Sequence, residues 1–387
     1  MHLSRKGLIG VLSLLSLLVF LSACEIPSKL MIGSSGGISY DWLRTNGKWI
    51  VDSQGNIVIL RGVNVHDVLY QPRTEDYKRI ASWGFNVVRL PIAWHNIETI
   101  RGFYDVSYLE SIDREIRLAK MYGIHVILAM HQYHWSPYFN FSGQEGYGMP
   151  MWVVGGYANN LEGFNQAITD FWIGKGPNGT EASEANPSMQ ELYINVWKFV
   201  VERYKLDSTV AIFELFNEPY HSSYIDPCLM PKYLFPFYCR IIETIRTADS
   251  RHIISYEPTG GWDSGRAQKL NFSNLAFTFH YYGRDIYDGN STALRDGFMY
   301  RYNPPCDWQS KPSAWNIPIY LGEFGTDAGP YNPNASKYVR DYRQILDDEV
   351  RIGWMWWIYG RSDTRGYELL HESGEEKVEL VPYLRIT

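Results

Sequence analysis

Residues 211–219 read Ala211-Ile212-Phe213-Glu214-Leu215-Phe216-Asn217-Glu218-Pro219, an apolar run that ends in an amide, a carboxylate and a proline. Such a run is typical of a strand that is buried on both faces, as in a parallel sheet. Steric contact with a proline keeps the preceding residue out of the helical region. We therefore expect Glu218 in extended backbone at the tip of a strand, with its side chain presented to a ligand.

A second carboxylate closes a similar run, Ile319-Tyr320-Leu321-Gly322-Glu323-Phe324-Gly325, in which the glycines allow close approach of backbone or ligand. One acid at a strand end carries little weight, because most glutamates are solvated or ion-paired. Two acids that close two separate buried strands are what glycoside hydrolysis needs. One must be protonated to donate a proton, and the other must be ionised to attack.

Short apolar runs recur along the chain, with helical patterns between most of them. The helical patterns are clearest in residues 107–122, 192–200 and 338–346, and poorest after the fifth run. Alternating strands and helices predict a parallel sheet, and eight units predict an α/β fold, a single closed (β/α)8 TIM barrel. Residues 48–56 look like a hairpin that plugs the bottom of this barrel. The predicted strands are residues 57–60, 86–91, 125–130, 211–216, 252–256, 275–279, 318–321 and 353–358.

The composition fits one large globular barrel. The chain has 387 residues, of which 45% are hydrophobic and 20% charged, as in a protein with a large core. The net charge of -6 argues against nucleic acid, which would favour a basic face. Aromatic residues make up 16% of the chain, and their flat rings suit stacking on sugars as well as core packing.

The N-terminus has the pattern of a targeting segment. Arg5 and Lys6 precede an apolar stretch, residues 8–21, that is too short to span a bilayer comfortably. Residues 21–24, Leu-Ser-Ala-Cys, resemble the lipobox of bacterial-type lipoproteins, which implies cleavage before Cys24 and lipid attachment to it. We expect export to the cell surface or beyond, with residues 1–23 as signal peptide, 24–40 as flexible tether and 41–387 as catalytic domain. The alternatives are an ordinary signal peptide or an uncleaved anchor.

The other cysteines do not fix a disulfide. If Cys24 is acylated, Cys228, Cys239 and Cys306 remain, and an odd number leaves one unpaired. Cys228 could join Cys239, or Cys306 could reach either of them. Their scatter and the lack of close Cys/His pairs make a structural zinc site unfavourable.

Residues 131–188, after the third predicted strand, form a connection much longer than a barrel needs. Long connections are usually functional or disordered, and its many aromatic residues argue against disorder. We expect a lid or wall over the catalytic face that sets substrate choice; the alternative is a plain structural insertion. The aromatic residues are Trp135, Tyr138, Phe139, Phe141, Tyr147, Trp152, Tyr157, Phe164, Phe171 and Trp172.

Catalytic groups of such barrels lie at the C-terminal ends of the strands. Each candidate there has a structural alternative: Arg89 could hold a core carboxylate instead of keeping Glu323 ionised, a lone histidine is more often structural, and Trp357 could be core. The residues at these ends are polar or amphipathic throughout. They are Asn64, His66, Arg89, His131, His134, Asn217, Glu218, Glu257, His280, Tyr282, Glu323 and Trp357.

In this order, the set resembles glycoside hydrolase family 5, the cellulase A type, from about Trp42 to the end of the chain. Residues 60–64, Leu-Arg-Gly-Val-Asn, resemble the family's first-strand motif, and Arg89 matches the arginine beneath the nucleophile. Residues 130–135, Met-His-Gln-Tyr-His-Trp, are similar to a phrase of the endoglycoceramidase-like members. The further matches are His66, His131, Asn217 with Glu218, His280, Tyr282, Glu323 and Trp357.

The resemblance implies a retaining, endo-acting β-glycosidase with Glu218 as acid/base and Glu323 as nucleophile. The expected substrate is a cellulose-type β-1,4-glucan; a mannan or the glycan of a glycolipid is the alternative. No metal or organic cofactor is required, and we expect a monomer. The substrate-binding residues would be His66, Arg89, His131, His134, Asn217, His280, Tyr282 and Trp357.

Two hypotheses from other classes compete. One is a metal-dependent hydrolase whose ligands are His66, His131, His134 and His280; the first strand lacks a His-x-His pair and no Asp closes the eighth, which speaks against it. The other is a lipid-anchored carbohydrate-binding protein without catalysis, which the presence of both acids disfavours.

Overall fold

The computed structural model describes residues 41–65, 73–143, 146–263, 266–283, 288–303, 312–363 and 366–386. The predicted signal peptide and tether, His66 and Cys306 lie outside these residues. Within the described part of the chain, every helix is too short or too polar to cross a membrane.

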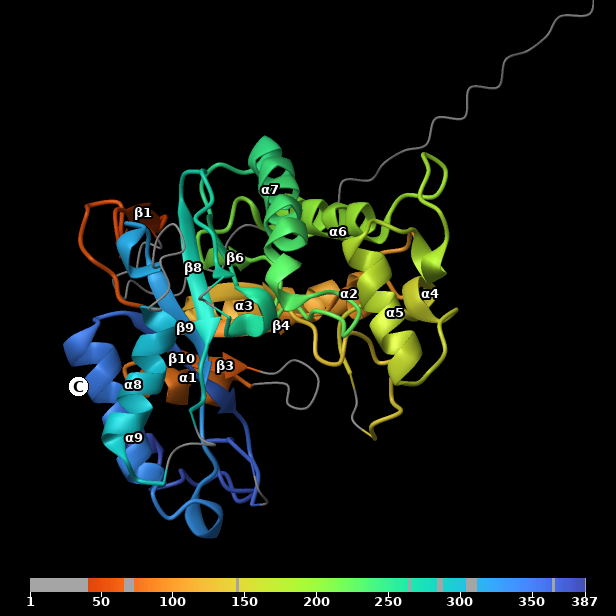
Figure 1. The fold of residues 1–387 in the computed structure, drawn as a ribbon. Helices are drawn as coiled ribbons and strands as arrows, with labels where there is room; N and C mark the ends of the chain where they lie inside the picture. The colour runs from red at the N-terminus through yellow and green to blue at the C-terminus, as the bar shows by residue number, and fades with distance from the viewer. Residues whose placement is uncertain are drawn as a thin grey trace, which may run out of the picture. The chain divides into compact units, whose positions relative to one another are not determined.

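Eight parallel strands form a closed barrel in the order β10-β3-β4-β5-β6-β7-β8-β9 (Figure 1). This confirms the predicted (β/α)8 TIM barrel. The barrel strands are β3 (Arg61–Val65), β4 (Val87–Ile92), β5 (His125–Met130), β6 (Val210–Glu214), β7 (Ile253–Tyr256), β8 (Leu275–His280), β9 (Ile319–Phe324) and β10 (Gly353–Tyr359). All of β4, β5 from Val126 onward, β6, β7, β8 and β9 are buried, as their apolar sequences predict.

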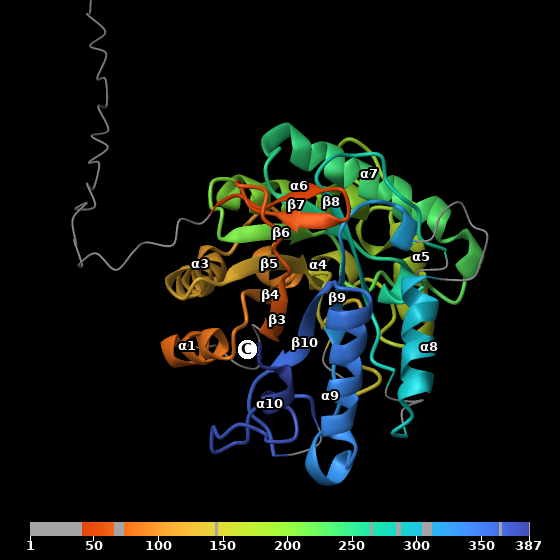
Figure 2. The same cartoon turned by 90° about the vertical axis from the view of Figure 1, so that its left-hand side faces the viewer.

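Helices follow most of the strands. Between β7 and β8 the described residues hold 3-10 conformation, as in Thr259–Gly261, but no α-helix, which agrees with the poor helical pattern there. Figure 2 shows α8 and α9 side by side. The helices are α1 (Thr74–Ser82), α2 (Trp94–Ile97), α3 (Val106–Met121), α4 (Met151–Val154), α5 (Leu161–Trp172), α6 (Met189–Tyr204), α7 (Pro231–Ala248), α8 (Ser291–Tyr302), α9 (Ala335–Arg343), a π-helix (Gln344–Glu349) and α10 (Val381–Leu384).

Local signals set the helix starts. Ser188 caps α6: its hydroxyl accepts from the Glu191 N–H, and the Glu191 carboxylate accepts from the Ser188 N–H. Asp105 caps α3 by accepting from the Tyr108 N–H. The three helical patterns that are clearest in the sequence correspond to α3, to α6, and to α9 with its π-helical continuation.

The first predicted strand is wrong. Residues 57–60 were expected to form it, but β3 begins at Arg61. The reason is that the first half of this segment pairs with the hairpin of β1 (Arg44–Asn46) and β2 (Trp49–Val51), where the Val58 N–H donates to the Ile50 carbonyl at 2.9 Å. The chain reaches the barrel only at Leu60, whose carbonyl accepts from the Trp354 N–H of β10 at 2.8 Å.

The hairpin closes the bottom of the barrel, as predicted. Leu43 and Ile50 are buried in one cluster with the inward-facing residues of the strands. That end of the barrel is therefore filled with apolar side chains. The inward-facing residues of the cluster are Leu60, Val87, Ile127, Ala211, Ile212, Ile253, Ala276, Tyr320 and Met355.

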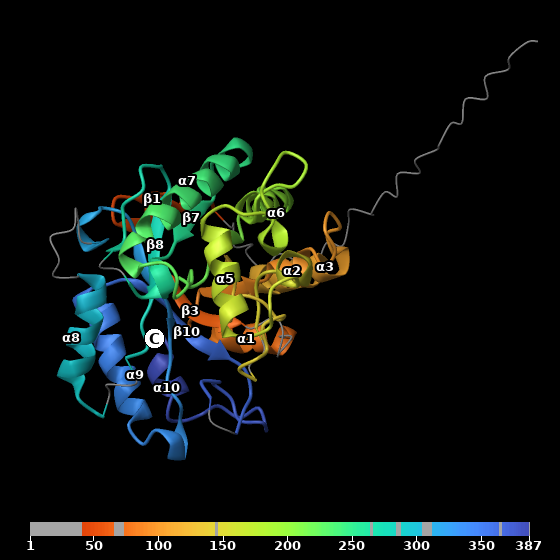
Figure 3. The same ribbon diagram turned by 45° about the vertical axis from the view of Figure 1, so that its right-hand side comes forward.

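Residues 131–188 form a folded insertion rather than an aromatic wall. It carries α4 and α5, and α5 lies next to α6 (Figure 3). The indole N–H of Trp172 donates to the Tyr220 carbonyl at 2.8 Å, and that of Trp152 to the Glu98 carbonyl at 2.9 Å. The expectation of a stacking wall is thus wrong for most of these rings, because they pack the insertion against the barrel and its helices. The buried ones are Trp135, Phe139, Tyr147, Tyr157, Phe171 and Trp172.

Candidate active site

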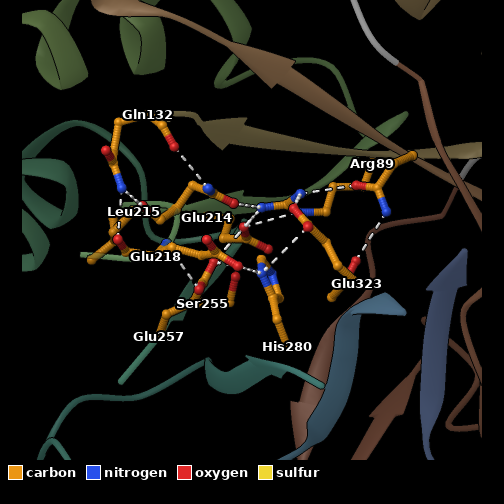
Figure 4. Close-up of polar contacts among 12 residues, drawn as sticks. Arg89, Gln132, Glu214, Leu215, Glu218, Ser255, Glu257, His280 and Glu323 are labelled. Carbon is orange, nitrogen blue, oxygen red and sulfur yellow. Dashed lines mark hydrogen bonds and ion pairs between the residues drawn. The ribbon is translucent and has the colours of Figure 1, made fainter. Parts of the chain in front are cut away.

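Arg89, on β4, is the centre of the polar network at the open end of the barrel. Its guanidinium is fully buried and donates to the Glu323 carboxylate at 2.7 Å, to Glu214 at 2.9 Å through Nε, and to the amide oxygens of Asn64 at 2.9 Å and Asn217 at 2.6 Å. Figure 4 shows the contacts of Arg89 with Glu214 and Glu323 as dashed lines. Arg89 therefore holds the ends of β3, β6 and β9 in one arrangement.

Glu323, on β9, has a partner on each carboxylate oxygen. Oε1 accepts from Arg89, and Oε2 accepts from the Tyr282 hydroxyl at 2.8 Å. Burial raises the pKa of Glu323 above its ordinary value, although His280 and Arg89 act in the opposite direction. We had expected Arg89 to place this pKa below the ordinary range, and the cost of burial outweighs that effect. The geometry still suits an attacking carboxylate.

Gly322 shows why a glycine precedes Glu323. A Cβ atom at this position would lie 2.7 Å from His280 Nε2 and 2.8 Å from Thr278 Oγ1. Only glycine leaves room for the imidazole at this point of the strand.

Glu218 lies four residues beyond the end of β6, in backbone that differs from the extended geometry we expected. Its φ is 40°, in the left-handed region. Two contacts hold it there: its N–H donates to Glu257 Oε2 at 3.0 Å, and its carbonyl accepts from Gln132 Nε2 at 2.6 Å. Tertiary hydrogen bonds thus override the preference that Pro219 imposes. Burial raises the pKa of Glu218 to about 7.

Glu218 and Glu323 are brought together, as predicted. One oxygen of each carboxylate lies within 4.8 Å of the other, and both face His280. His280 Nδ1 is 2.9 Å from Glu218 Oε1 and 3.6 Å from Glu323 Oε2. Burial lowers the pKa of His280 to about 4, so the ring is neutral near pH 7. This separation suits a pair of carboxyl groups that act on the same bond, in which one attacks directly and the other donates a proton.

Two further glutamates complete the network, and we had given neither a role. Glu214 accepts from Arg89 and from the Tyr320 hydroxyl at 2.7 Å, and despite its burial Arg89 lowers its pKa. Glu257 Oε1 lies 3.6 Å from Arg89 and 3.4 Å from His280 Nε2; burial, then Glu214, raises its pKa well above the ordinary value. A signal for Glu214 exists in the sequence, since a glutamate inside an apolar strand must have a buried partner.

Gly261 lets the chain after β7 approach Glu218 and Glu257 closely. A Cβ atom here would lie 2.7 Å from Glu218 Cγ and 2.9 Å from Glu257 Oε2, and its φ is +77°. Both the space and the backbone conformation require glycine.

Of the other predicted residues, Asn217 belongs to the hydrogen-bond network of Arg89, whereas His131 and His134 make ring contacts. The Nδ2 of Asn217 also donates to the Gln132 carbonyl at 3.0 Å. His131 stacks on Trp357 with ring centroids 5.7 Å apart and planes at 12°. His134 packs edge-on against Tyr133, and within the described residues it forms no hydrogen bond or ion pair with the carboxylates of Glu218 and Glu323.

The histidine metal site of the competing hypothesis is not assembled by the part of the chain that is described. The donor groups that come within 4.8 Å of one another there are Glu214, Glu257 and His280, and Glu218, His280 and Glu323. Neither group contains His131 or His134.

A family model described as cellulase, glycosyl hydrolase family 5, matches residues 51–363. An endoglycoceramidase of Cyanea nozakii is 26% identical over 370 residues, which cover 80% of this chain. The chain spans 67% of that protein's length and 58% of the length of a Hydra vulgaris endoglycoceramidase that is 25% identical and matches over 71% of this chain.

Further similarity extends to a glucanase and to solved structures. Endoglucanase B of Acetivibrio thermocellus is 28% identical over 205 residues, 46% of this chain and 30% of that protein. The structure of endo-glycoceramidase II from Rhodococcus sp. in complex with ganglioside GM3 superposes with a TM-score of 0.71 at 24% identity, covering 88% of this chain and 81% of that one. At this identity, the structural likeness concerns the fold.

Proposed function

The chain belongs to glycosyl hydrolase family 5 and is a glycoside hydrolase, and we propose that it is a retaining, endo-acting β-glycosidase in which Glu218 is the acid/base and Glu323 the nucleophile. The observation that supports this most directly is the separation of the two carboxylates, whose oxygens come within 4.8 Å. Inverting enzymes need roughly 6.5–9.5 Å to admit a water between the acids.

The first step forms a covalent intermediate. Ionised Glu323 attacks the anomeric carbon, the glycosidic C–O bond breaks, and its electron pair stays on the leaving oxygen, which takes the proton of Glu218. A pKa of about 7 keeps that proton on Glu218 in weakly acidic to neutral solution. Arg89 and the Tyr282 hydroxyl direct Glu323 through hydrogen bonds to both of its oxygens.

The second step reverses the roles. Glu218, now ionised, accepts a proton from water; the water oxygen attacks the anomeric carbon, and the bond to Glu323 breaks. His280 Nδ1 lies 2.9 Å from Glu218, where a neutral imidazole can hydrogen-bond either protonation state of that carboxyl group.

For the substrate, we propose the glycan of a glycolipid, cut at the bond to its lipid alcohol. The similarity to endoglycoceramidases over 80% of the chain supports this substrate class. A β-1,4-glucan is the second candidate, supported by the similarity to endoglucanase B. Product analysis on glucosylceramide-based glycolipids, cellulose, mixed-linkage glucan and mannan decides between them, because each candidate predicts a different released product.

The roles of the two glutamates are tested by azide rescue. Glu323→Ala should abolish turnover of an aryl β-glycoside, and azide should restore it with formation of the α-glycosyl azide, because the anion attacks from the emptied side. The matched control is Glu218→Ala on a substrate with a good leaving group, where azide should give the β-glycosyl azide through the intact intermediate. If azide rescues neither variant and a separate water-activating base proves essential, the retaining assignment is wrong.

We also propose that the mature chain starts at Cys24, carries lipid there and stays at the cell surface. The motivation is the lipobox-like sequence that ends at Cys24. Mass spectrometry of the native N-terminus should find a diacylglyceryl modification on Cys24, and Cys24→Ser should release the protein from the membrane fraction. An unmodified N-terminus at Glu25 or beyond would refute the anchor.

A further inference from the structure

A groove of about 410 Å³ opens directly beside the acid/base. Glu218, His280 and Tyr282 form its inner end, and Trp262 and Tyr300 line its outer part; Glu323 does not line it. In a retaining glycosidase the leaving group departs on the side of the acid/base. The groove therefore occupies the place of the leaving group.

Two exposed rings widen this region into a longer surface. Trp262 is 45% exposed and Tyr300 is 48% exposed, so both rings are accessible to a ligand. Both also line a second hollow of about 300 Å³ further from Glu218, so the two hollows share this wall. Flat exposed rings of this kind bind sugar or aryl faces by stacking.

The unusual residue of the groove is Arg301, which lines both hollows. Its guanidinium carbon lies 5.1 Å from the Tyr300 ring centroid and 5.7 Å from that of Tyr281. Its Nε is buried without a hydrogen-bond partner, and among the described residues no carboxylate forms an ion pair with it. By contrast, the neighbouring Arg266 is paired with Asp263.

A position in the last turn of α8 makes a cation favourable, but it does not supply the missing partner of Nε. A neutral apolar leaving group would cover this guanidinium and leave its donors unsatisfied, which is costly. A carboxylate or phosphate would satisfy them, because the planar guanidinium matches the geometry of these groups.

We infer that the groove beside Glu218 is a subsite for a leaving group that carries an anionic substituent, a carboxylate or a phosphate, which Arg301 binds. The inference rests on the proposed retaining mechanism for the side of departure. It narrows the glycolipid proposal, because the lipid alcohol that uses this subsite carries an acidic group, which ceramide lacks. A second sugar that carries an acidic group fits the subsite equally.

The test compares aryl β-cellobiosides whose rings carry a carboxylate, a phosphonate or the neutral methyl ester. For the wild-type protein and for Arg301→Gln, kcat/KM is measured on each substrate. For each protein, kcat/KM on an anionic substrate is divided by kcat/KM on the methyl ester, and the resulting ratio of the variant is then divided by that of the wild type. This quotient cancels the intrinsic reactivity of the leaving groups. We expect the ratio to fall roughly fivefold to tenfold in Arg301→Gln, and to recover in part in Arg301→Lys. Added salt should reduce the wild-type ratio.

The matched control is Arg295→Gln on the same helix, since Arg295 pairs with Glu349 and does not line the groove. Its ratio should equal that of the wild type. An unchanged ratio in Arg301→Gln overturns the inference, as does a salt-independent wild-type ratio if the variant fails to fold. A preference for carboxylate over phosphonate, or the reverse, identifies the source of the anion.

Failure of the proposed function would look different. In that case no cellobioside of any charge is hydrolysed, and calorimetry of the free phenols then tests the groove without turnover. Binding of the free carboxylate or phosphonate that weakens in Arg301→Gln still supports the anionic subsite, and equal binding by both proteins refutes it.

Discussion

Glu218 illustrates how a single residue acquires its chemistry from its surroundings. Its backbone is fixed by Glu257 and Gln132, and its half-buried carboxyl group lies beside a neutral His280. Burial is the main cause of the raised pKa of Glu218, about 7. The proton needed for cleavage is therefore retained by position and not by a partner that would have to be displaced.

This pKa predicts the pH dependence of the reaction. Cleavage needs Glu218 protonated, so kcat/KM should fall about tenfold per pH unit above pH 7. It also needs Glu323 ionised, so the acidic limb should lie above the ordinary pKa of a glutamate, because burial raises the pKa of Glu323.

The measurement is kcat/KM against pH on two aryl β-glycosides. A poor leaving group needs the proton of Glu218 and should show both limbs; a dinitrophenyl leaving group does not need it and should lose most of the alkaline limb. If both substrates show the same alkaline limb, that limb belongs to another group and Glu218 is not the acid.

At the scale of elements, the sequence predicts the strands, but it does not predict the contacts that join segments far apart in the chain. Residues buried on both faces leave an unbroken apolar signal, and residues 125–130 form β5 as predicted. Ile57 and Val58 belong to a run with the same signal but pair with the hairpin, a contact that the local pattern does not contain. Likewise, both catalytic candidates follow from strand ends, whereas the pairing of Glu214 with Arg89 depends on strands far apart in sequence.

The insertion of residues 131–188 gives the prediction at this scale. Trp172 packs against Phe171 and Phe237, with ring centroids 5.0 and 5.9 Å apart, and it is 3% exposed. Trp172→Ala should lower the free energy of unfolding by about 3–5 kcal/mol and should reduce activity on short and long substrates alike. Urea unfolding and kinetics on an aryl cellobioside and a long glucan measure both effects.

Phe141 is the matched control in the same insertion, because it is 41% exposed. Phe141→Ala should cost much less stability than Trp172→Ala. A selective loss of activity on the long substrate in Trp172→Ala, with stability unchanged, would restore the stacking wall that the buried rings argue against.

At the scale of the whole molecule, several carboxyl groups lie around one guanidinium at the open end of the barrel. Glu214, Glu218, Glu257 and Glu323 all lie near Arg89, which gives more acids than one cation can balance. Burial raises the pKa of Glu218, and burial together with the neighbouring carboxylates, Glu214 foremost, raises that of Glu257. Folding therefore keeps protons that the unfolded chain would release.

Linkage turns these protons into a stability profile. A carboxyl group whose pKa is raised in the folded state stabilises the fold fully below its unfolded pKa of about 4.3, and this contribution is lost as the pH rises through the folded pKa. For Glu218 the loss runs from about pH 4.3 to its folded value of about 7. Within that window each such group lowers the free energy of unfolding by about 1.4 kcal/mol per pH unit.

Glu257→Gln tests this directly, because the amide has a similar shape and does not titrate. Its free energy of unfolding should fall less steeply between pH 5 and 8 than that of the wild type, by up to about 1.4 kcal/mol per pH unit. Urea unfolding at several pH values measures the slopes, and Glu243→Gln, at an exposed site on α7, is the control that should keep the wild-type slope. Equal slopes for Glu257→Gln and the wild type would mean that Glu257 is already ionised in the folded protein, with Arg89 balancing more of the buried charge than burial alone allows.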